Sequence, residues 1–294
     1  MPVETKVADL ESGSRASYAA IGGGEPLLWI EGGPGYPAQL GLPDCELLAH
    51  RFRCYLVDSP GSGLSTPARD RRGYEYEEVV RFFDEARRAL GHDRWTVMGH
   101  SWGGLIALAY AACFPEVVAR LIVVDGYAGD ASVPSEVASA ASERALARHP
   151  GSERLLAAAG ESGELTEQTT TADLMAEVWP LYPLYFAHPQ RRTQQEHITR
   201  LRRDGVLNAD IQRAWNMGDY AAELDLRPLL EKISCPTLVL VGAHDWVCGP
   251  VWAEVIAADI ANARLHVFEE SGHCPQYEQP EEFVAVIEDW LSVR

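Results

Sequence analysis

The sequence predicts an α/β protein whose mostly parallel central sheet carries helices on both faces, with a helical cap inserted after the sixth strand. Short apolar runs typical of buried strands recur along the chain and alternate with helical segments. The alternation stops over residues 128–230, which contain no comparable run and are rich in helix-forming residues. We therefore expect a core formed by residues 1–127 and 231–294, and a cap formed by residues 128–230.

Composition and charge narrow the class of protein. The chain has 294 residues, 47% of them apolar, which suffices for one large α/β domain that carries an insertion. Its formal net charge of −18 disfavours binding to the phosphates of nucleic acids or to an anionic membrane. The first residues lack the basic and apolar regions of a secretory signal, and no apolar run could span a bilayer, so we expect a cytoplasmic protein.

The cysteines indicate neither disulfides nor a metal centre. There are six, and they form no C-x-x-C pair and no spacing typical of metal ligands. In a cytoplasmic protein this pattern predicts reduced thiols, most of them buried as small apolar side chains. We expect no bound metal and no cofactor.

The first half of the core follows from local patterns. The first twenty residues alternate weakly and predict one or two edge strands. Residues 27–30 and 54–57 are buried-strand runs, and a glycine-rich loop follows each of them directly. From residue 76 to 90, apolar side chains recur at helical spacing, and we expect this helix to stop at Gly91.

The rest of the core repeats the same rhythm. Residues 95–98 predict a strand, followed by a helix to about residue 113 and a strand at 121–124. After the cap, strands are expected at 237–241 and 265–268, with a helix near 250–260 and an amphipathic helix from about residue 281. Within the cap, helical stretches are expected at 133–148, 152–160, 172–178 and 190–216.

A serine turn lies between the strand at 95–98 and the helix that follows. Gly99-His100-Ser101-Trp102-Gly103 fits the pattern G-x-S-x-G, in which a serine at the apex of a sharp strand-to-helix turn is a nucleophile. The residues two before and two after the serine must be very small because neighbouring backbone passes close by. The alternative is an ordinary glycine-rich turn, so other parts of the chain must supply a base, an acid and an oxyanion hole.

Two later strand ends carry a candidate acid and a candidate base. Asp245 lies in the turn after the strand at 237–241, and His273 follows the strand at 265–268. Because ligands bind at the carboxyl ends of parallel strands, these side chains can face Ser101. Taken singly, Asp245 could cap the next helix and His273 could be an ordinary loop histidine. Asp125, also at a strand end, is the reserve acid.

These residue types fit nucleophilic catalysis. An unactivated serine hydroxyl is a poor nucleophile, so His273 would take its proton while Asp245 orients the imidazole and stabilises its charge. An oxyanion hole needs two backbone donors, which we assign to Trp102 and to Gly33 in the glycine-rich loop at residues 32–35. A phosphate cradle is the alternative for this loop, but the helix start and lysine that such a cradle needs are missing.

Five motifs together resemble those of the proline iminopeptidase group of α/β-hydrolases. The pattern of that group is H-G-G-P-G, D-x-x-G-x-G-x-S, G-x-S-W-G and an acid followed three residues later by cysteine. The corresponding stretches, in the same order on both sides of the insertion, are Glu31-Gly-Gly-Pro-Gly35, Asp58-Ser-Pro-Gly-Ser-Gly-Leu-Ser65, Gly99-His-Ser-Trp-Gly-Gly104, Asp245-Trp-Val-Cys248 and Gly272-His273. The cap corresponds only in its place and length.

The resemblance implies an α/β-hydrolase fold with a triad and an oxyanion hole. The triad would be Ser101, Asp245 and His273, and the oxyanion hole would use Gly33 and Trp102. The cap would shape the substrate pocket. In such peptidases, carboxylates of the cap and the pocket hold the free amino terminus of the substrate.

The chain departs from this pattern at Glu31, where the group has histidine. A carboxylate beside an oxyanion hole opposes the developing negative charge unless it points away, is protonated or pairs with a cation. Glu31 is therefore expected either to pair with an arginine such as Arg51 or Arg53, or to hold a cationic or hydroxylated substrate. Either outcome puts strict iminopeptidase specificity in doubt.

Further candidates for the substrate pocket come from aromatic residues of the cap and from Cys248. Trp179, Tyr182, Tyr185 and Trp215 could line an apolar pocket, or they could belong to ordinary core. Cys248 follows Asp245 by three residues and is expected near the site without taking part in the chemistry.

The leading functional hypothesis is a cofactor-independent serine hydrolase that forms an acyl-enzyme. Its substrate would be a small molecule or short peptide, cleaved at an amide or ester bond. Lactone hydrolysis, C–C bond hydrolysis and a biosynthetic cyclisation are alternatives on the same scaffold, and a non-catalytic ligand receptor is another. The chain retains all three candidate catalytic residues, Ser101, Asp245 and His273, which argues against a non-catalytic receptor. The sequence does not indicate the oligomeric state.

Overall fold

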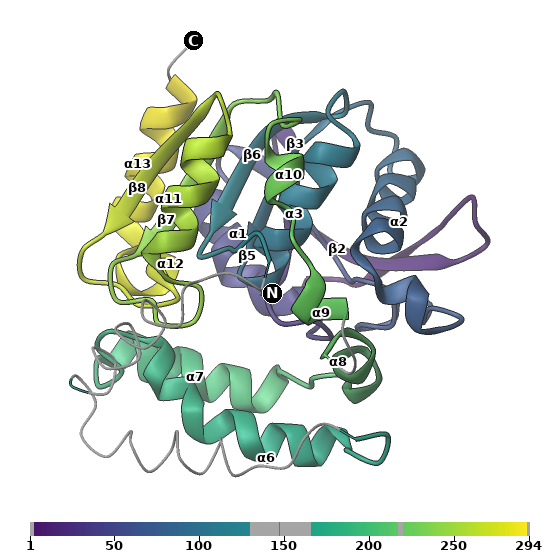
Figure 1. The fold of residues 1–294 in the computed structure, drawn as a ribbon, viewed down its shortest axis with the longest axis horizontal. Helices are drawn as coiled ribbons and strands as arrows, with labels where there is room; N and C mark the ends of the chain where they lie inside the picture. The colour runs from purple at the N-terminus through teal and green to yellow at the C-terminus, as the bar shows by residue number, and fades with distance from the viewer. Residues whose placement is uncertain (1–2, 130–146, 148–165, 217–219, 293–294) are drawn as a thin grey trace.

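An eight-stranded sheet forms the centre of the computed structural model, which describes residues 3–129, 147, 166–216 and 220–292 (Figure 1). The strand order is β1-β2-β4-β3-β5-β6-β7-β8. β1 and β2 pair antiparallel with each other, β2 pairs antiparallel with β4, and the remaining pairs are parallel. The strands are β1 (Lys6–Asp9), β2 (Arg15–Gly22), β3 (Glu25–Ile30), β4 (Phe52–Val57), β5 (Trp95–His100), β6 (Val118–Val124), β7 (Thr237–Gly242) and β8 (Ala263–Phe268). The prediction of a mostly parallel sheet is confirmed.

Helices cover both faces of this sheet, as the sequence predicts. α2 (Tyr76–Ala89), α3 (Trp102–Cys113) and α11 (Gly249–Asp259) share one hydrophobic core with the sheet. α1 (Leu42–Leu48) and α13 (Pro280–Ser292) share the other. The strands between them are buried on both faces, which explains why they appear in the sequence as continuous apolar runs.

Most of the core helices follow the predicted boundaries. α2 ends at Ala89, and Gly91 has a φ of 79°, the left-handed conformation that commonly terminates helices. The helix α1 was not predicted, because its seven residues are too few to show a helical period and include a proline. The short helix α12 (Pro275–Glu278) belongs to the described core, and α10 (Arg227–Leu230), in the last residues of the expected cap, packs against α3 and α11 of the core.

The described parts of the segment between β6 and β7 consist of helices and the loops that connect them. They contain α6 (Thr171–Leu181), α7 (Arg192–Asp204), α8 (Ala209–Asn216) and α9 (Tyr220–Glu223). Figure 1 shows α6 and α7 side by side against one end of the core. The stretch expected at 190–216 is two helices separated at Gly205, while the stretches expected at 133–148 and 152–160 lie outside the described residues, apart from residue 147.

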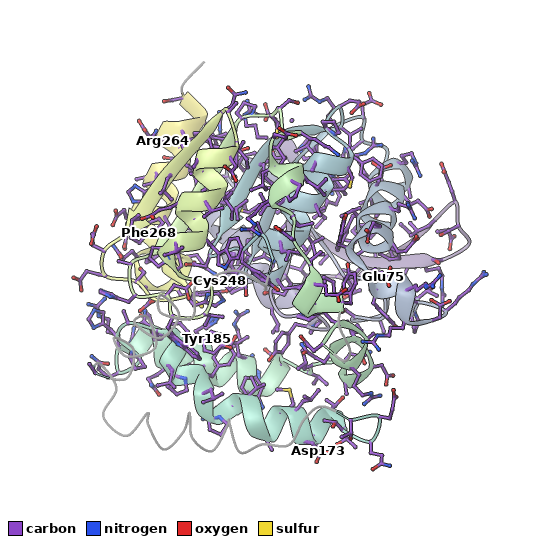
Figure 2. The ribbon with its side chains drawn as sticks, viewed as in Figure 1. Glu75, Asp173, Tyr185, Cys248, Arg264 and Phe268 are labelled. Atoms are coloured by element: carbon purple, nitrogen blue, oxygen red, sulfur yellow. The ribbon has the colours of Figure 1, made fainter. Side chains whose placement is uncertain are left out.

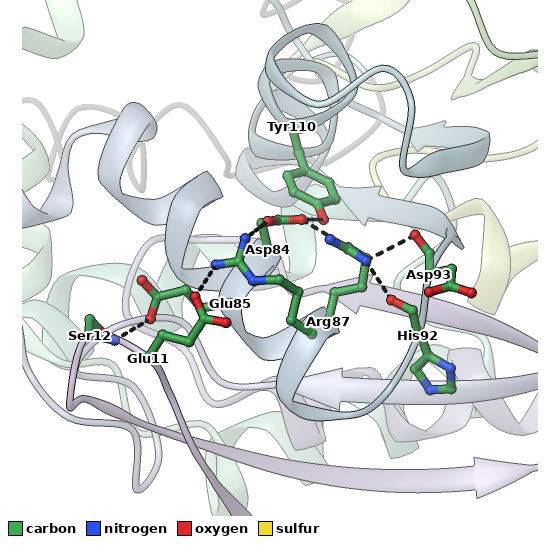
Figure 3. Close-up of polar contacts among 9 residues, drawn as sticks. Glu11, Ser12, Asp84, Glu85, Arg87, His92, Asp93 and Tyr110 are labelled. Carbon is green, nitrogen blue, oxygen red and sulfur yellow. Dashed lines mark hydrogen bonds and ion pairs between the residues drawn. The ribbon is translucent and has the colours of Figure 1, made fainter.

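A buried ion pair fixes α2 against α3 and the start of β5 (Figure 3). Asp84 Oδ1 accepts hydrogen bonds from Arg87 Nε at 2.9 Å and from the Tyr110 hydroxyl at 3.1 Å. Arg87 also donates to the carbonyl oxygens of His92 and Asp93, which directly precede β5. Both charged side chains are buried, and Arg87 depends on Asp84 for compensation, whereas Asp84 also pairs with Arg88 at 2.7 Å. The cluster thereby positions the strand that leads to Ser101.

The cysteine prediction is confirmed. All six cysteines are free thiols, and all but Cys113 are buried. Among the described helices, none has the length and apolar character that crossing a bilayer requires.

Candidate active site

Ser101 occupies a strained turn between β5 and α3. Its φ of 55° and ψ of −121° lie outside the regions that non-glycine residues normally adopt. A Cβ added to Gly99 would lie 2.0 Å from the carbonyl oxygen of Gly103, and a Cβ on Gly103 would lie 2.1 Å from that of Ile30. The two glycines are therefore required for the close backbone contacts of this turn. Strain of this kind persists where the surrounding structure enforces it, and it is concentrated at functional sites.

His273 and Asp245 form a buried pair at the ends of β8 and β7. His273 Nδ1 lies 3.0 Å from Asp245 Oδ2, although the N–H is not aligned for a regular hydrogen bond. Asp245 also accepts from the backbone N–H groups of Val247 at 2.8 Å and Gly249 at 3.2 Å. Burial opposes ionisation, but the charge of His273 and these donors outweigh it and lower the pKa of Asp245. Asp245 is thus an ionised partner suited to orient His273.

Asp125, the reserve acid, makes different contacts. Its Oδ1 accepts from the N–H of Gly242 at 2.9 Å. Burial and the nearby charge of Asp245 raise the pKa of Asp125 well above its usual range. The structure therefore pairs His273 with Asp245, while the surroundings of Asp125 disfavour its charged form.

The loop that carries His273 is tied to the segment following α6. The N–H of His273 donates to the carbonyl oxygen of Tyr185 at 2.7 Å. Glu278, in α12, accepts from the N–H of Gly272 at 2.6 Å and from that of Ala187 at 2.8 Å. His273 consequently depends for its position on the segment that follows α6, as well as on the core.

Two backbone N–H groups near Ser101 are free to bind an oxyanion. In the described part of the chain, neither Gly33 nor Trp102 donates its N–H to a protein acceptor, and Trp102 is the first residue of α3. Gly33 has a φ of 61°, which favours glycine. Gly32 is unsuitable because its N–H already donates to Glu31 Oε1 at 3.0 Å. This arrangement agrees with the assignment of Gly33 and Trp102.

Two cavities meet at Ser101. The first, called here the carboxylate pocket, has a volume of about 240 Å³ and contains Glu31, Asp44, His273 and Gln276 in its wall. The second, the aromatic pocket, has a volume of about 740 Å³. Its wall includes Trp102, Tyr127, Trp215, Trp246, Cys248 and Trp252. Figure 2 shows Cys248 at the edge of the core, near Tyr185 on the cap side.

Ser101 and His273 both line the carboxylate pocket, but no hydrogen bond joins them in the described structure. Hydrogen bonds between a nucleophile and its base are often long without a substrate and tighten when one binds. Tyr185 packs its ring 5.3 Å from that of His273 and helps to fix the imidazole.

Glu31 lines the carboxylate pocket and forms no ion pair with an arginine in the part of the chain that the structure describes. Its carboxylate accepts from Trp29 Nε1 at 3.1 Å and from the N–H of Gly32. The expected pairing with Arg51 or Arg53 is wrong, because Arg53 pairs in the sheet with Pro26, at the far end of β3, roughly 16 Å along the strand. Burial, followed by the neighbouring Asp44, raises the pKa of Glu31 to about 8.

Asp44 is the second acid of this pocket and is only 1% exposed. Its Oδ2 accepts from the Tyr277 hydroxyl, whereas its Oδ1 has no partner in the described structure. Burial raises the pKa of Asp44 to about 7, against the opposing effects of Tyr277 and the charge of Arg200. Asp44 belongs to the unpredicted helix α1, and no motif marked it.

The remaining residues predicted for substrate binding divide into two groups. Tyr182 and Tyr185 stack at 5.0 Å and line the carboxylate pocket, while Trp215 and Cys248 line the aromatic pocket. Trp179 is not part of either wall. Its ring lies beside Tyr182 and its carbonyl oxygen accepts from Arg202, so it packs inside the cap.

His100 is a site residue to which the serine motif assigned no role. Its Nε2 donates to the carbonyl oxygen of His273 at 2.7 Å and supports the loop that carries the base. Burial and the nearby His273 lower the pKa of His100 to about 3, so the ring is neutral. The sequence feature that could have pointed to His100 is its position inside the G-x-S-x-G motif.

One set of side chains has the proximity that a metal site needs. Asp245, Cys248 and His273 offer ligand atoms within 4.8 Å of one another. The carboxylate oxygens of Asp245 are already occupied by backbone donors and His273. Burial and the charge of Asp245 raise the pKa of the Cys248 thiol well above its usual range, which disfavours the thiolate that a metal would bind.

The chain matches the family model described as alpha/beta hydrolase fold over residues 25–280, and it belongs to this family. It is 28% identical over 293 residues to a proline iminopeptidase of Heyndrickxia coagulans, with 96% of each chain covered. It is 27% identical over 279 residues to a proline iminopeptidase of Saccharolobus solfataricus, with 94% of this chain and 87% of the relative covered. The protein is thus a hydrolase similar to proline iminopeptidases.

Solved structures show the same fold. A proline iminopeptidase of Mycobacterium smegmatis superposes with a TM-score of 0.74 at 21% identity, covering 98% of this chain and 97% of that one. An enol-lactonase of Burkholderia xenovorans LB400 gives a TM-score of 0.74 at 22% identity, covering 98% and 100%. At these identities the likeness concerns the fold alone.

Proposed function

We propose that this hydrolase cleaves small amides, short peptides or esters through an acyl-enzyme formed on Ser101. The observation that carries the assignment is the strained Ser101, which lines the same cavity as His273, the histidine paired with the buried Asp245. A strained serine without a base would be unreactive, and a buried histidine without a nucleophile would have no proton to move. Their convergence on one cavity favours nucleophilic catalysis over an ordinary turn.

In the first step, Ser101 Oγ bonds to the substrate carbonyl carbon as His273 accepts the hydroxyl proton. The carbonyl oxygen becomes an oxyanion, which the N–H groups of Gly33 and Trp102 stabilise. His273 then gives the proton to the leaving nitrogen or oxygen, and the bond from that atom to the carbonyl carbon breaks. Water, activated in the same way, releases the acyl group.

Cleavage of amide or peptide bonds is supported by the relatives named proline iminopeptidase, which match almost the whole chain. We further propose that residues 128–230 form a cap domain that shapes the substrate pocket. Side chains of α6 and α7, including Leu174, Val178 and Leu201, contribute to the wall of the carboxylate pocket. The same fold also hosts lactone and C–C bond hydrolysis, so product analysis must identify the bond that is cleaved.

A panel of substrates tests this proposal. Aminoacyl arylamides, including prolyl and alanyl, are compared with short esters and lactones for wild type and Ser101→Ala. Hydrolysis in ¹⁸O-labelled water incorporates the label into the acid product, whereas cyclisation or isomerisation does not. We expect labelled product from at least one amide or ester and a loss of about 10⁶-fold in kcat for Ser101→Ala. Undiminished turnover by that variant would refute the mechanism.

A further inference from the structure

The two cavities that meet at Ser101 differ in which part of the catalytic machinery they contact. His273, the proposed proton donor to the leaving group, lines the carboxylate pocket. Trp102, the proposed second oxyanion donor, lines the aromatic pocket. Ser101 and Gly33 line both. A substrate bound across Ser101 therefore has one end in each pocket.

The reaction determines which end enters which pocket. When the tetrahedral intermediate collapses, the bond between the carbonyl carbon and the leaving atom breaks, and that atom receives the proton held by His273. The leaving atom must then lie within hydrogen-bond reach of the imidazole. The leaving group consequently extends into the carboxylate pocket, and the acyl group extends into the aromatic pocket.

Two buried acceptor atoms in the wall of the carboxylate pocket lack donors. Asp44 Oδ1 and Gln276 Oε1 are both buried without a partner in the described structure, and these residues are 1% and 2% exposed. Glu31 adds a second carboxyl group to the same wall. Buried acceptors without donors are unfavourable, so this wall is built for a ligand that brings donors.

Among the described residues, no basic side chain neutralises these two acids through an ion pair. Within the described residues, neither Glu31 nor Asp44 forms an ion pair with a basic side chain. The charge of Arg200 lowers the pKa of both acids. Its Nη2, however, donates to the carbonyl oxygen of Leu40 at 2.9 Å and to the Tyr277 hydroxyl at 3.3 Å. His197, which also lines the pocket, is neutral because burial lowers its pKa to about 2.

We propose that the leaving group of the natural substrate carries a protonated amine, held by Asp44, Gln276 and Glu31 in the carboxylate pocket. The substrate would be an acyl group joined through an amide or ester bond to a leaving group that carries a separate protonated amine. This proposal rests on the acyl-enzyme mechanism proposed above. The cation supplies up to three donors to the unpaired acceptors. A leaving group that places a free carboxylate in this pocket is disfavoured by repulsion from the two acids, so short peptides should be poorer substrates than amides of cationic amines.

The protonation behaviour of Glu31 and Asp44 fits a cationic ligand. Burial raises the pKa of Glu31 to about 8 and that of Asp44 to about 7, so both are partly protonated near neutral pH before the cation binds. A positive charge favours their ionised forms, and binding should release protons to the solvent.

The experiment compares amides that share a 3-phenylpropanoyl group and differ in the leaving amine. The amide of 1,4-diaminobutane keeps one protonated amine, the amide of pentylamine is neutral and of the same length, and the amide of 5-aminopentanoate carries a carboxylate. Release of each amine is measured by mass spectrometry. The p-nitrophenyl ester of the same acid serves as the test of Ser101 chemistry. We expect kcat/KM for the cationic amide to exceed that for the pentyl amide by about tenfold or more, as for one charge-assisted hydrogen bond. The carboxylated amide should be the slowest.

Three variants test which pocket holds the protonated amine of the leaving group. Asp44→Asn, which keeps the shape of the side chain, should reduce the ratio of cationic to neutral kcat/KM at least about fivefold. Glu196→Gln, an exposed carboxylate of α7, controls for overall charge and should leave that ratio unchanged. Glu254→Gln alters the exposed carboxylate that lines the aromatic pocket. A fall in the ratio for Glu254→Gln and not for Asp44→Asn would overturn the assignment of the pockets.

A binding measurement covers the case in which Asp44→Asn does not fold. In wild type, 4-aminobutan-1-ol, which carries a protonated amine, should inhibit hydrolysis of the p-nitrophenyl ester competitively, about tenfold more strongly than the neutral pentan-1-ol. Equal rates or equal inhibition by the cationic and neutral compounds would overturn the leaving-group proposal while leaving Ser101 chemistry intact. Failure of wild type to cleave even the p-nitrophenyl ester would instead overturn the acyl-enzyme mechanism, and the leaving-group proposal with it.

Discussion

Replacing Glu31 by glutamine is expected to stabilise the folded protein increasingly as the pH rises from 5 to 9. Burial raises the pKa of Glu31 to about 8 in the folded state, from 4.5 for an ordinary glutamate. The folded state therefore binds the proton more tightly than the unfolded chain does. Stability from this group is fully present below about pH 4.5 and is lost as the pH rises through about 8.

The size of this loss can be bounded from the two pKa values. Each pKa unit corresponds to 1.36 kcal/mol, so ionisation of Glu31 removes at most about 5 kcal/mol from the free energy of unfolding. Glutamine does not ionise and escapes that loss. In wild type, both carboxylate oxygens accept hydrogen bonds, from Trp29 Nε1 and from the N–H of Gly32. The NH₂ group of glutamine must face one of these two donors, and we expect the lost hydrogen bond to cost about 1 kcal/mol at every pH.

Urea unfolding of wild type and Glu31→Gln between pH 5 and pH 9 measures this difference. The variant should be slightly less stable than wild type at pH 5 and more stable by about 2–4 kcal/mol at pH 9. Glu25→Gln, an exposed carboxylate at the start of the same strand, is the matched control and should show no rising trend. A difference for Glu31→Gln that stays flat from pH 5 to pH 9 would refute burial of an ionisable group at this position.

Three further substitutions test other parts of the structure. Gly99→Ala would place a Cβ 2.0 Å from the carbonyl oxygen of Gly103, so we expect loss of folding or of all turnover, measured by circular dichroism and ester hydrolysis. Asp84→Ala leaves Arg87 buried without its partner and should lower the free energy of unfolding by about 3–5 kcal/mol in urea titrations. Asp245→Asn should preserve the fold and lower kcat by about 10⁴-fold; a loss below tenfold would contradict its proposed role.

The parts of the site that depend on local backbone could be predicted from the sequence. The turn at Ser101 requires glycine at two fixed positions, and continuous apolar runs mark the strands that end beside it. Asp245 and His273 each follow such a run directly. Because parallel strands end at one edge of the sheet, their proximity followed from topology alone.

The walls of the pockets could not be predicted, because they depend on contacts between distant parts of the chain. Asp44 lies in a seven-residue helix with too few turns to show a period, and its partner Tyr277 is 233 residues away. Neither residue belongs to a motif. The cation whose charge acts on Glu31 is Arg200 of α7, whereas proximity in sequence had suggested Arg51 or Arg53. Side-chain pairing across the pocket is a tertiary property that no local pattern encodes.

Labelling with a fluorophosphonate tests the central claim, that Ser101 is the nucleophile, most directly. Intact-mass spectrometry of wild type should show one adduct, and peptide mapping should place it on Ser101. Ser101→Ala should show none, while Cys248→Ser, which alters a buried neighbour in the aromatic pocket, should still be labelled. An unlabelled wild type, or an adduct mapped to another residue, would contradict the proposed mechanism.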